Sequence, residues 1–171
     1  RTLEVAGERG WIPMSSNLVY HTLLPTHWEA VETGAARTGR KVSRSQWRIA
    51  REVFVARTRD EAYQYALNGS IQRAFDRYFR GLLRLQQRGL TGLKSHPEMP
   101  DDAITVPYLA DNIWIVGSPS DVADKLRLLY GQTGGFGTLL MVTHDWDEKE
   151  KWLRCMDLLA DKVMPKLADL T

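Results

Sequence analysis

The sequence predicts a parallel α/β fold, because short apolar strands alternate with amphipathic helices along most of the chain. Three segments have the composition of buried strands, residues 11–17, 47–57 and 138–143. Each leads into a segment with helical spacing of apolar residues, which is typical of strands joined by crossover helices. A complete eight-stranded barrel needs about 200 residues or more. Because this chain has 171 residues, we expect an open sheet or part of a barrel.

The composition is that of one ordinary globular domain. Hydrophobic residues make up 43% of the chain and charged residues 26%, which is enough for one core and too balanced for disorder. The 23 basic and 21 acidic residues are interspersed, so neither a nucleic-acid nor a membrane partner is indicated. The lone Cys155 excludes an internal disulfide. With no signal-peptide pattern at the start, we expect a cytoplasmic protein.

The first forty residues predict two helices with a strand between them. Residues 1–10 resemble the last turns of a helix that Gly10 would stop, as though the chain had been entered midway. The strand at 11–17 follows. Thr26 lies three residues before Glu29, which is the spacing of a capping box, and predicts a helix over residues 26–37.

The second strand leads into a helical region and then into an irregular one. Thr58 and Glu61 repeat the capping-box spacing directly after residues 47–57. Apolar residues at helical spacing then predict a long amphipathic helix that ends near Gln87, with a buried stripe formed by Ile71, Phe75, Tyr78, Phe79, Leu82 and Leu83. Glycines and prolines interrupt residues 89–111, and loops of that length are usually functional covers or disordered segments.

The last third of the chain has the clearest local signals. Residues 112–116 form a brief extended piece, and Ser118 followed by Pro119 and Asp121 predicts the start of a helix. After strand 138–143, a final helix over about residues 148–168 is expected to be bent or frayed near its end by a proline. Its buried face is expected to contain Leu153, Met156, Leu159 or Ala160, Val163 and Leu167. Cys155 lies beside that face, where a buried filler is expected.

A polar and aromatic cluster, His144-Asp145-Trp146-Asp147, ends the apolar strand at 138–143. In parallel α/β folds the carboxyl ends of the strands form the ligand-binding face, which favours this cluster as a site. A structural alternative is equally open. Asp145 or Asp147 could cap the following helix, and Trp146 could cover its first turn. His21, His27 and His96 show no spacing typical of a metal site, so we expect no metal.

Several motifs, in this order, resemble those of the bacterial luciferase-like flavin monooxygenases, and most closely the limonene and diketocamphane branch. They are Ala6–Gly10, Trp47-Arg48, Phe54–Thr58, Gly117-Ser118-Pro119 with Val122, Gly134–Leu140 and His144–Asp147. The resemblance implies that residues 1–171 are a single partial domain, the carboxyl-terminal half of a (β/α)8 barrel of the TIM type. The three strands become its sixth, seventh and eighth. Residues 59–116 become an insertion after the seventh strand, part of it an active-site cover, with 112–116 an extended connection.

The same resemblance implies chemistry and partners. Reduced FMN, bound non-covalently, reacts with dioxygen to form a peroxyflavin, which oxygenates a small apolar substrate such as a terpenoid, ketone or aldehyde. A flavin reductase supplies the reduced FMN, and a homo-oligomer is expected. An amino-terminal half or a second copy would cover the open sheet. Four apolar side chains would point toward that partner: Ile12, Met14, Phe54 and Leu140.

The candidate site residues are those at the strand ends. His144 is the candidate catalytic residue, through a hydrogen bond to flavin, peroxyflavin or substrate, or else it is a structural histidine. The candidate pocket residues are Ser15, Ser16, Asn17, Arg57, Asp145 and Trp146. Two other functions remain open, a non-catalytic flavin-binding or interaction protein of the same fold and a deazaflavin-dependent oxidoreductase. Oxygen uptake with an oxygenated product would distinguish the monooxygenase from the non-catalytic protein. Exchange of the cofactor would distinguish it from the deazaflavin-dependent oxidoreductase.

Overall fold

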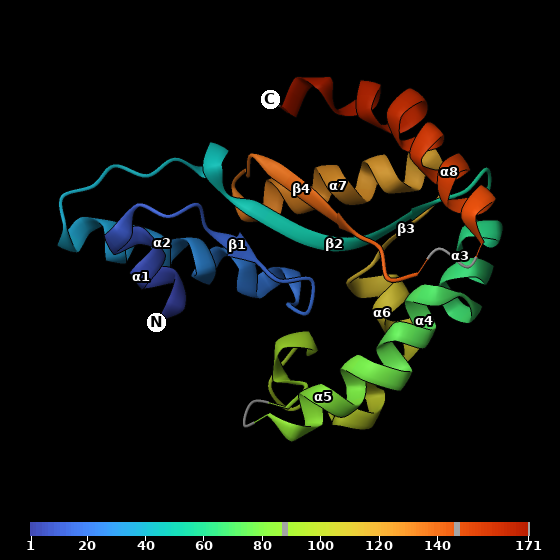
Figure 1. The fold of residues 1–171 in the computed structure, drawn as a ribbon, viewed down its shortest axis with the longest axis horizontal. Helices are drawn as coiled ribbons and strands as arrows, with labels where there is room; N and C mark the ends of the chain where they lie inside the picture. Colours follow the sequence, from blue (N-terminus) through green and yellow to red (C-terminus); the bar gives the residue numbers. More distant parts are fainter. Residues whose placement is uncertain (87–88, 146–147, 171) are drawn as a thin grey trace.

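Within the part of the chain that the structure describes, four strands form one parallel sheet with β2 at its centre (Figure 1). The computed structural model describes residues 1–86, 89–145 and 148–170. The strands are β1 (Met14–Ser15), β2 (Arg48–Val55), β3 (Ile115–Gly117) and β4 (Thr138–Val142). β1 pairs with the start of β2, β4 pairs with residues 48–52 and β3 with residues 53–55, all in parallel. The predicted parallel arrangement of the three main strands is therefore confirmed, although only two residues of the predicted strand 11–17 are paired.

Helices connect and flank the strands (Figure 1). The α-helices are α1 (Thr2–Arg9), α2 (Leu24–Arg37), α3 (Arg59–Asn68), α4 (Ser70–Ala74), α5 (Arg80–Leu85), α6 (Val106–Asn112), α7 (Pro119–Thr133) and α8 (Lys149–Leu158). A π-helical turn, Phe75–Phe79, joins α4 to α5, and a second one, Leu159–Val163, extends α8 into the 3-10 segment Met164–Leu170. Shorter 3-10 turns lie at His21–Leu23, Arg44–Gln46, Thr91–Leu93 and Asp101–Ala103. None of the helices among the described residues is long and apolar enough to cross a membrane.

The predicted helix starts are only partly correct. The Ser118 hydroxyl and the Asp121 carboxylate form a complete capping box at α7, as expected. Thr58 caps α3 by accepting a hydrogen bond from the Glu61 backbone N–H. At α2 the expectation is wrong, because the helix begins two residues before Thr26, whose hydroxyl instead donates to the Leu23 carbonyl at 2.7 Å.

The expected extended connection at 112–116 is also wrong, because β3 pairs with β2 through three residues. β2 is eight residues long, and its last three residues lie beyond the part that pairs with β1 and β4. β3 pairs with the backbone of that end, and the Val55 N–H donates to the Cys155 sulfur, so buried backbone groups find partners there. The preceding irregular segment contains α6 and two of the 3-10 turns.

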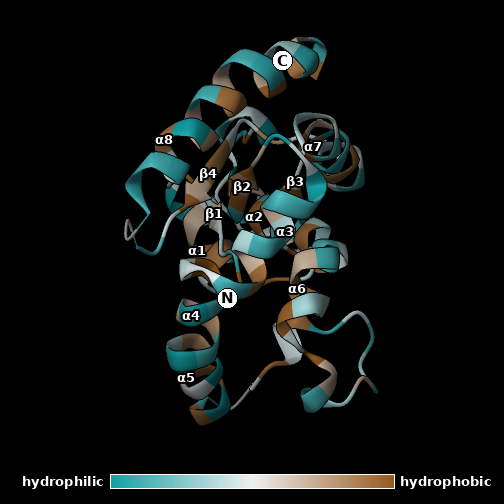
Figure 2. Cartoon of the chain, turned by 90° about the vertical axis from the view of Figure 1, so that its right-hand side faces the viewer, coloured by the Kyte–Doolittle hydropathy of each residue, from teal (hydrophilic) through white to brown (hydrophobic). Residues whose placement is uncertain are grey.

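The register of the sheet defines two faces. In parallel strands, paired residues point to the same side, and the side alternates along each strand. One face, here called the covered face, carries Ser15, Ile49, Arg51, Val53, Leu139 and Met141. The other, here called the open face, carries Met14, Arg48, Ala50, Glu52, Thr138, Leu140 and Val142. Figure 2 shows hydrophobic residues concentrated on the strands and on the helix sides that face them.

The expected apolar surface of the open face is partly present. Ile12 is 54% exposed and Met14 55% exposed, whereas Leu140 is half-buried. The expectation for Phe54 is wrong. Its ring is buried, stacked on Tyr65 with ring centroids 4.0 Å apart, and it meets Trp152 edge to face.

Two predicted helix stripes are only partly correct, although Val163 of the second is buried as expected. In the helical segment 70–85, Ile71, Phe75 and Leu83 are buried as expected, but Tyr78 is 62% exposed. The π-helical turn inserts one extra residue per turn, which shifts the residues that follow relative to a regular 3.6-residue pattern. In α8, Leu153 is exposed, while Trp152 and the correctly predicted Cys155 are fully buried.

Candidate functional site

Three polar side chains meet where β1 and β4 end, beside the middle of β2. Glu52 comes from the open face of β2, Asn17 from the loop after β1 and His144 from the segment after β4. The Asn17 side-chain amide donates to Glu52 Oε1 at 2.5 Å, and His144 Nε2 lies 3.1 Å from the same oxygen. The Glu52 carboxylate is 3% exposed. One buried oxygen thus joins residues that are 35 and 92 positions away in the sequence.

The two oxygens of the Glu52 carboxylate differ in their hydrogen bonding. Glu52 Oε2 is buried and has no hydrogen-bond partner among the described residues. Leaving such an acceptor without a donor costs about 1–3 kcal/mol. Polar groups of this kind are rare in folded proteins and mark places where a water, an ion or a ligand supplies the missing partner. Glu52 Oε2 is therefore available to accept a hydrogen bond from a bound water or ligand.

An aromatic ring from the helical region fixes the other side of His144. Phe79, in the π-helical turn after α4, meets the imidazole edge to face with ring centroids 5.5 Å apart. The His144 side chain is only 12% exposed. Residues from the segment between β2 and β3 thus cover a polar cluster that the strand ends build, which reduces its contact with water.

Arg51 stabilises the loop after β1 from the covered face. Its guanidinium donates to the carbonyl oxygens of Ser16 at 3.3 Å, Val19 at 2.9 Å and Ala50 at 2.9 Å. Burial lowers the pKa of Arg51 to about 10, and the neighbouring Glu52 charge opposes that shift. The loop that carries Asn17 is therefore held by backbone contacts as well as by its own side chain.

The structure brings together only some of the predicted site residues. His144 and Asn17 share Glu52, and the Ser16 hydroxyl lies 3.4 Å from the Asn17 side-chain oxygen. Arg57 and Asp145 are exposed. Trp146 and Asp147 lie outside the described residues. Asp145 is not the cap of α8, because the residue at that position is Glu148, which makes no side-chain capping bond.

Ser15 lies on the covered face, away from the cluster. Its hydroxyl accepts a hydrogen bond from the Trp47 indole at 3.0 Å and pairs with His27 Nδ1 at 2.9 Å. Burial lowers the pKa of His27, and the nearby Arg51 charge acts in the same direction. Ser15 and His27 thus connect β1 to α2, which is a structural role.

Sequence reasoning missed Glu52 and Phe79. A signal for Glu52 was available, because Arg51 and Glu52 are two adjacent charges inside an otherwise apolar strand. Charged side chains in such a position are buried only when they are paired or hydrogen-bonded. No comparable local signal marks Phe79, which has the spacing of an ordinary core residue.

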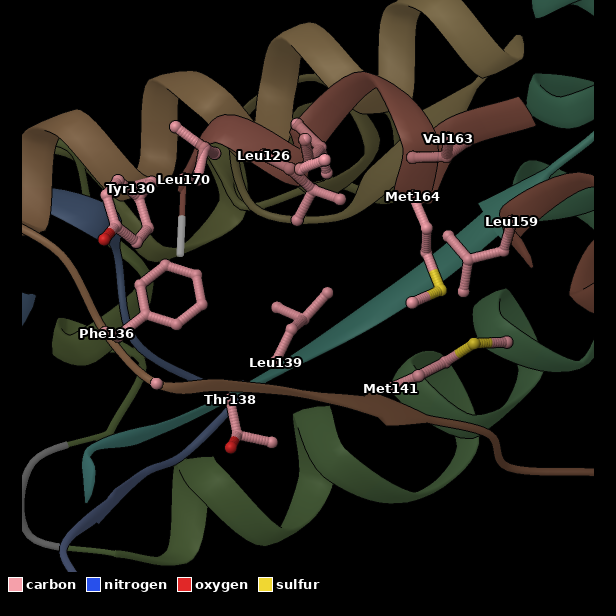
Figure 3. Close-up of a pocket in the computed structure, with 13 residues that line it drawn as sticks. Leu126, Tyr130, Phe136, Thr138, Leu139, Met141, Leu159, Val163, Met164 and Leu170 are labelled. Carbon is pink, nitrogen blue, oxygen red and sulfur yellow. The ribbon is translucent and has the colours of Figure 1, made fainter. Parts of the chain in front are cut away.

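Two larger cavities flank the sheet. One, of about 630 Å³, lies between the loop after β1 and α5, and its lining includes Ser16, Leu18, Val19, Leu82 and Leu83. The other, of about 620 Å³, lies on the covered face between β4, α7 and the segment 159–170. Figure 3 shows Leu139 and Met141 pointing into this second cavity and Thr138 pointing away from it. Only the first cavity adjoins the polar cluster, through Ser16.

No group of three His, Cys, Asp or Glu side chains within residues 1–86, 89–145 and 148–170 is arranged to hold a metal ion. Hydrogen bonding and proton transfer are the chemistry that the Glu52 cluster itself can perform.

Comparison with known proteins gives clear relatives. The chain is 32% identical to 3,6-diketocamphane 1,6-monooxygenase from Pseudomonas putida over 97% of its own length and 44% of that protein. It is 26% identical to limonene 1,2-monooxygenase from Rhodococcus erythropolis over 83% of its length and 34% of that protein. No family model matches the sequence.

A solved structure shares the fold. It is the oxygenating constituent of 3,6-diketocamphane monooxygenase from Pseudomonas putida, described as a type II Baeyer–Villiger monooxygenase in complex with FMN. It aligns with a TM-score of 0.85 and 31% identity over 96% of this chain and 45% of that chain. The chain thus spans about half the length of the relatives it matches. By sequence and by fold, it belongs to the luciferase-like monooxygenase family that includes the diketocamphane and limonene monooxygenases.

Proposed function

We propose that this chain forms the carboxyl-terminal half of the barrel of a flavin-dependent monooxygenase that uses reduced FMN and dioxygen to oxygenate a small apolar substrate. The observation that carries the proposal is the match to an FMN-bound monooxygenase, at 31% identity over 96% of this chain. The relatives include enzymes named for diketocamphane and limonene, which favours a terpenoid or ketone substrate.

The Glu52 cluster fits one edge of a flavin. The ring system of FMN carries N–H donors and carbonyl acceptors along its edge, and the cluster has a buried carboxylate oxygen without a partner among the described residues. Glu52, Asn17 and His144 are the residues of this chain that would contact that edge. When bound, reduced FMN supplies the electrons that activate dioxygen. The chain's own residues orient the ring, exclude water and hold protons near it.

The covering residues support the exclusion of water. Phe79 packs on His144, and the cavity beside Ser16 is lined on its other side by Leu82 and Leu83. We propose that this cavity receives part of the apolar substrate and that residues 59–116 form the insertion that covers it. Ser16 remains a candidate for a polar contact at its rim, and Arg57 remains a candidate pocket residue after the end of β2.

Exposed apolar residues on the open face favour a further element that covers it. Ile12 and Met14 are more than half exposed, and Met14 is the first residue of the short edge strand β1. Exposed apolar groups next to a sheet edge favour a further element that pairs with it. We propose that an amino-terminal half of the barrel or a second copy covers this face, and that a separate reductase supplies reduced FMN.

The test is oxygen consumption by the full-length protein that contains this sequence. With reduced FMN and a bicyclic ketone or limonene, we expect oxygen uptake matched by an oxygenated product. Flavin binding without a product would favour the non-catalytic alternative. Turnover with a reduced deazaflavin and not with FMN would favour the oxidoreductase alternative.

A further inference from the structure

We propose that Glu52 is a positioning residue that fixes the proton of His144 on Nε2 and so presents Nδ1 to the bound ligand. The catalytic part of this inference rests on the proposed function, whereas the proton position does not. No residue of β2 was singled out as a functional group by sequence reasoning, and Glu52 acts from the middle of the sheet.

The geometry of the shared oxygen determines the proton position. A carboxylate only accepts hydrogen bonds, and an amide nitrogen only donates them. Glu52 Oε1 accepts from the Asn17 amide nitrogen at 2.5 Å, and His144 Nε2 approaches the same atom to 3.1 Å. Two donors on one oxygen are the arrangement that suits an anion. Nε2 therefore carries the imidazole proton.

The other ring nitrogen is then the functional one. With Nε2–H directed at Glu52, a neutral His144 offers Nδ1 as an acceptor, and among the described residues this nitrogen has no partner. The ring cannot turn freely, because Phe79 packs against it at 5.5 Å and 63°. His144 therefore accepts a hydrogen bond or a proton from an O–H or N–H of the ligand. It donates from Nδ1 only after it has taken up a proton, when the Glu52 carboxylate balances the charge.

This assignment refines the role expected for His144. With its proton fixed on Nε2, the imidazole presents Nδ1 as a hydrogen-bond acceptor. Asn17 has a supporting role, because its amide occupies the same carboxylate oxygen and holds the loop after β1 in place. Carboxylates that orient metal-binding histidines contribute about tenfold or more to their sites, and we expect an effect of the same order here.

The proton position can be measured without turnover. In the full-length protein labelled with 15N-histidine, we expect the imidazole nitrogen shifts of His144 to report the Nε2–H form. Glu52→Gln should shift His144 toward a mixture of tautomers, because a carboxamide can donate as well as accept. Glu29→Gln, the same chemical change at an exposed position of α2, is the matched control and should leave the shifts unchanged. A protonated Nδ1 in the wild-type protein, or no change with Glu52→Gln, would overturn the inference.

A double-mutant cycle tests the catalytic part. We expect Glu52→Gln to lower oxygenated product per reduced flavin consumed by about tenfold and His144→Ala to lower it further. The two changes should be non-additive, because Glu52 acts through His144. Glu52→Gln that lowers the yield equally in the presence and absence of His144 would contradict positioning.

A failure of the proposed function can be distinguished from a failure of the proposed proton position. An unchanged product yield in His144→Ala would reject the role of His144 in the proposed function, and the tautomer measurement would still decide the position of the proton. If Glu52→Gln fails to fold, Glu52→Asp keeps the charge but draws the carboxylate back from Nε2. Glu52→Asp should also give a mixture of the two His144 tautomers. A fixed Nε2–H form in that variant would count against the proposal.

Discussion

Arg51 and Glu52, consecutive residues of β2, hold the loop after β1 from opposite faces of the sheet. Arg51 binds its backbone carbonyls at Ser16 and Val19, and Glu52 binds the side chain of Asn17. Each charge is buried in a strand where an apolar residue would be expected. The two buried charges thus give up apolar core contacts and instead fix the conformation of the loop. Functional sites require side chains held in a fixed geometry of this kind.

Arg51→Met should therefore destabilise the protein. The change introduces an apolar side chain of similar length and leaves buried carbonyl oxygens without a donor. We expect the free energy of unfolding, measured by urea denaturation, to fall by about 2–3 kcal/mol. The control is Arg48→Met on the same strand, where the side chain is exposed and the change should be small. Equal effects of the two substitutions would show that Arg51 does not hold the loop.

The start of α7 gives a second test, because two hydroxyl residues with similar sequence signals have different roles. Ser118 accepts from the Asp121 N–H, whereas Thr26 donates back to the Leu23 carbonyl inside α2. Ser118→Ala should lower the melting temperature by an amount that corresponds to about 1 kcal/mol. Thr26→Ala should be close to neutral. The reverse order would mean that α2 begins at the cap that the sequence predicted.

Local signals account for the parts of the fold that the sequence predicted. Residues 138–142 are a strand because they form an apolar run, and α7 begins where a serine, a proline and an aspartate coincide. The sequence marked residues 112–116 as extended, but three residues carry too little pattern to show that β3 joins the sheet, and the family resemblance favoured a connection there. Its pairing depends on β2 extending beyond its other two neighbours.

Asn17 and His144 could be predicted as site residues from the sequence, whereas Glu52, which binds both, could not. His144 and Asn17 follow strands directly, so their positions at the carboxyl edge of a parallel sheet could be inferred. Glu52 lies inside a strand, and its partners are 35 and 92 residues away. Only the folded chain shows that one carboxylate oxygen serves both. Arg57, which also follows a strand, is exposed instead, because the strand end alone does not fix where a long side chain points.

The thiol of Cys155 predicts a loss of stability in alkali. Burial raises its pKa to about 11 from a usual value of 9.0, and the Val55 N–H, which donates to the sulfur, opposes the shift. The folded state keeps its proton where the unfolded state loses it, so this contribution is complete below pH 9 and disappears as the pH rises to about 11. The difference amounts to about 3 kcal/mol. Cys155→Ala should remove this component from the pH dependence of unfolding. Parallel curves for the two proteins would contradict the raised pKa.

Two glycines in helix interiors should respond to alanine in opposite directions. A β-carbon at Gly34 of α2 would lie 1.9 Å from the Glu4 carbonyl oxygen of α1, whereas one at Gly131 of α7 would meet no atom within 4 Å. Gly34→Ala must therefore push α1 from α2, and we expect a loss of more than about 2 kcal/mol, as for an overpacked core site. Gly131→Ala should instead stabilise the protein by about 0.5–1 kcal/mol, because alanine restricts the unfolded chain and favours the helix. Thermal unfolding of both variants measures the difference. Similar effects of the two substitutions would mean that α1 does not pack on α2 at backbone contact.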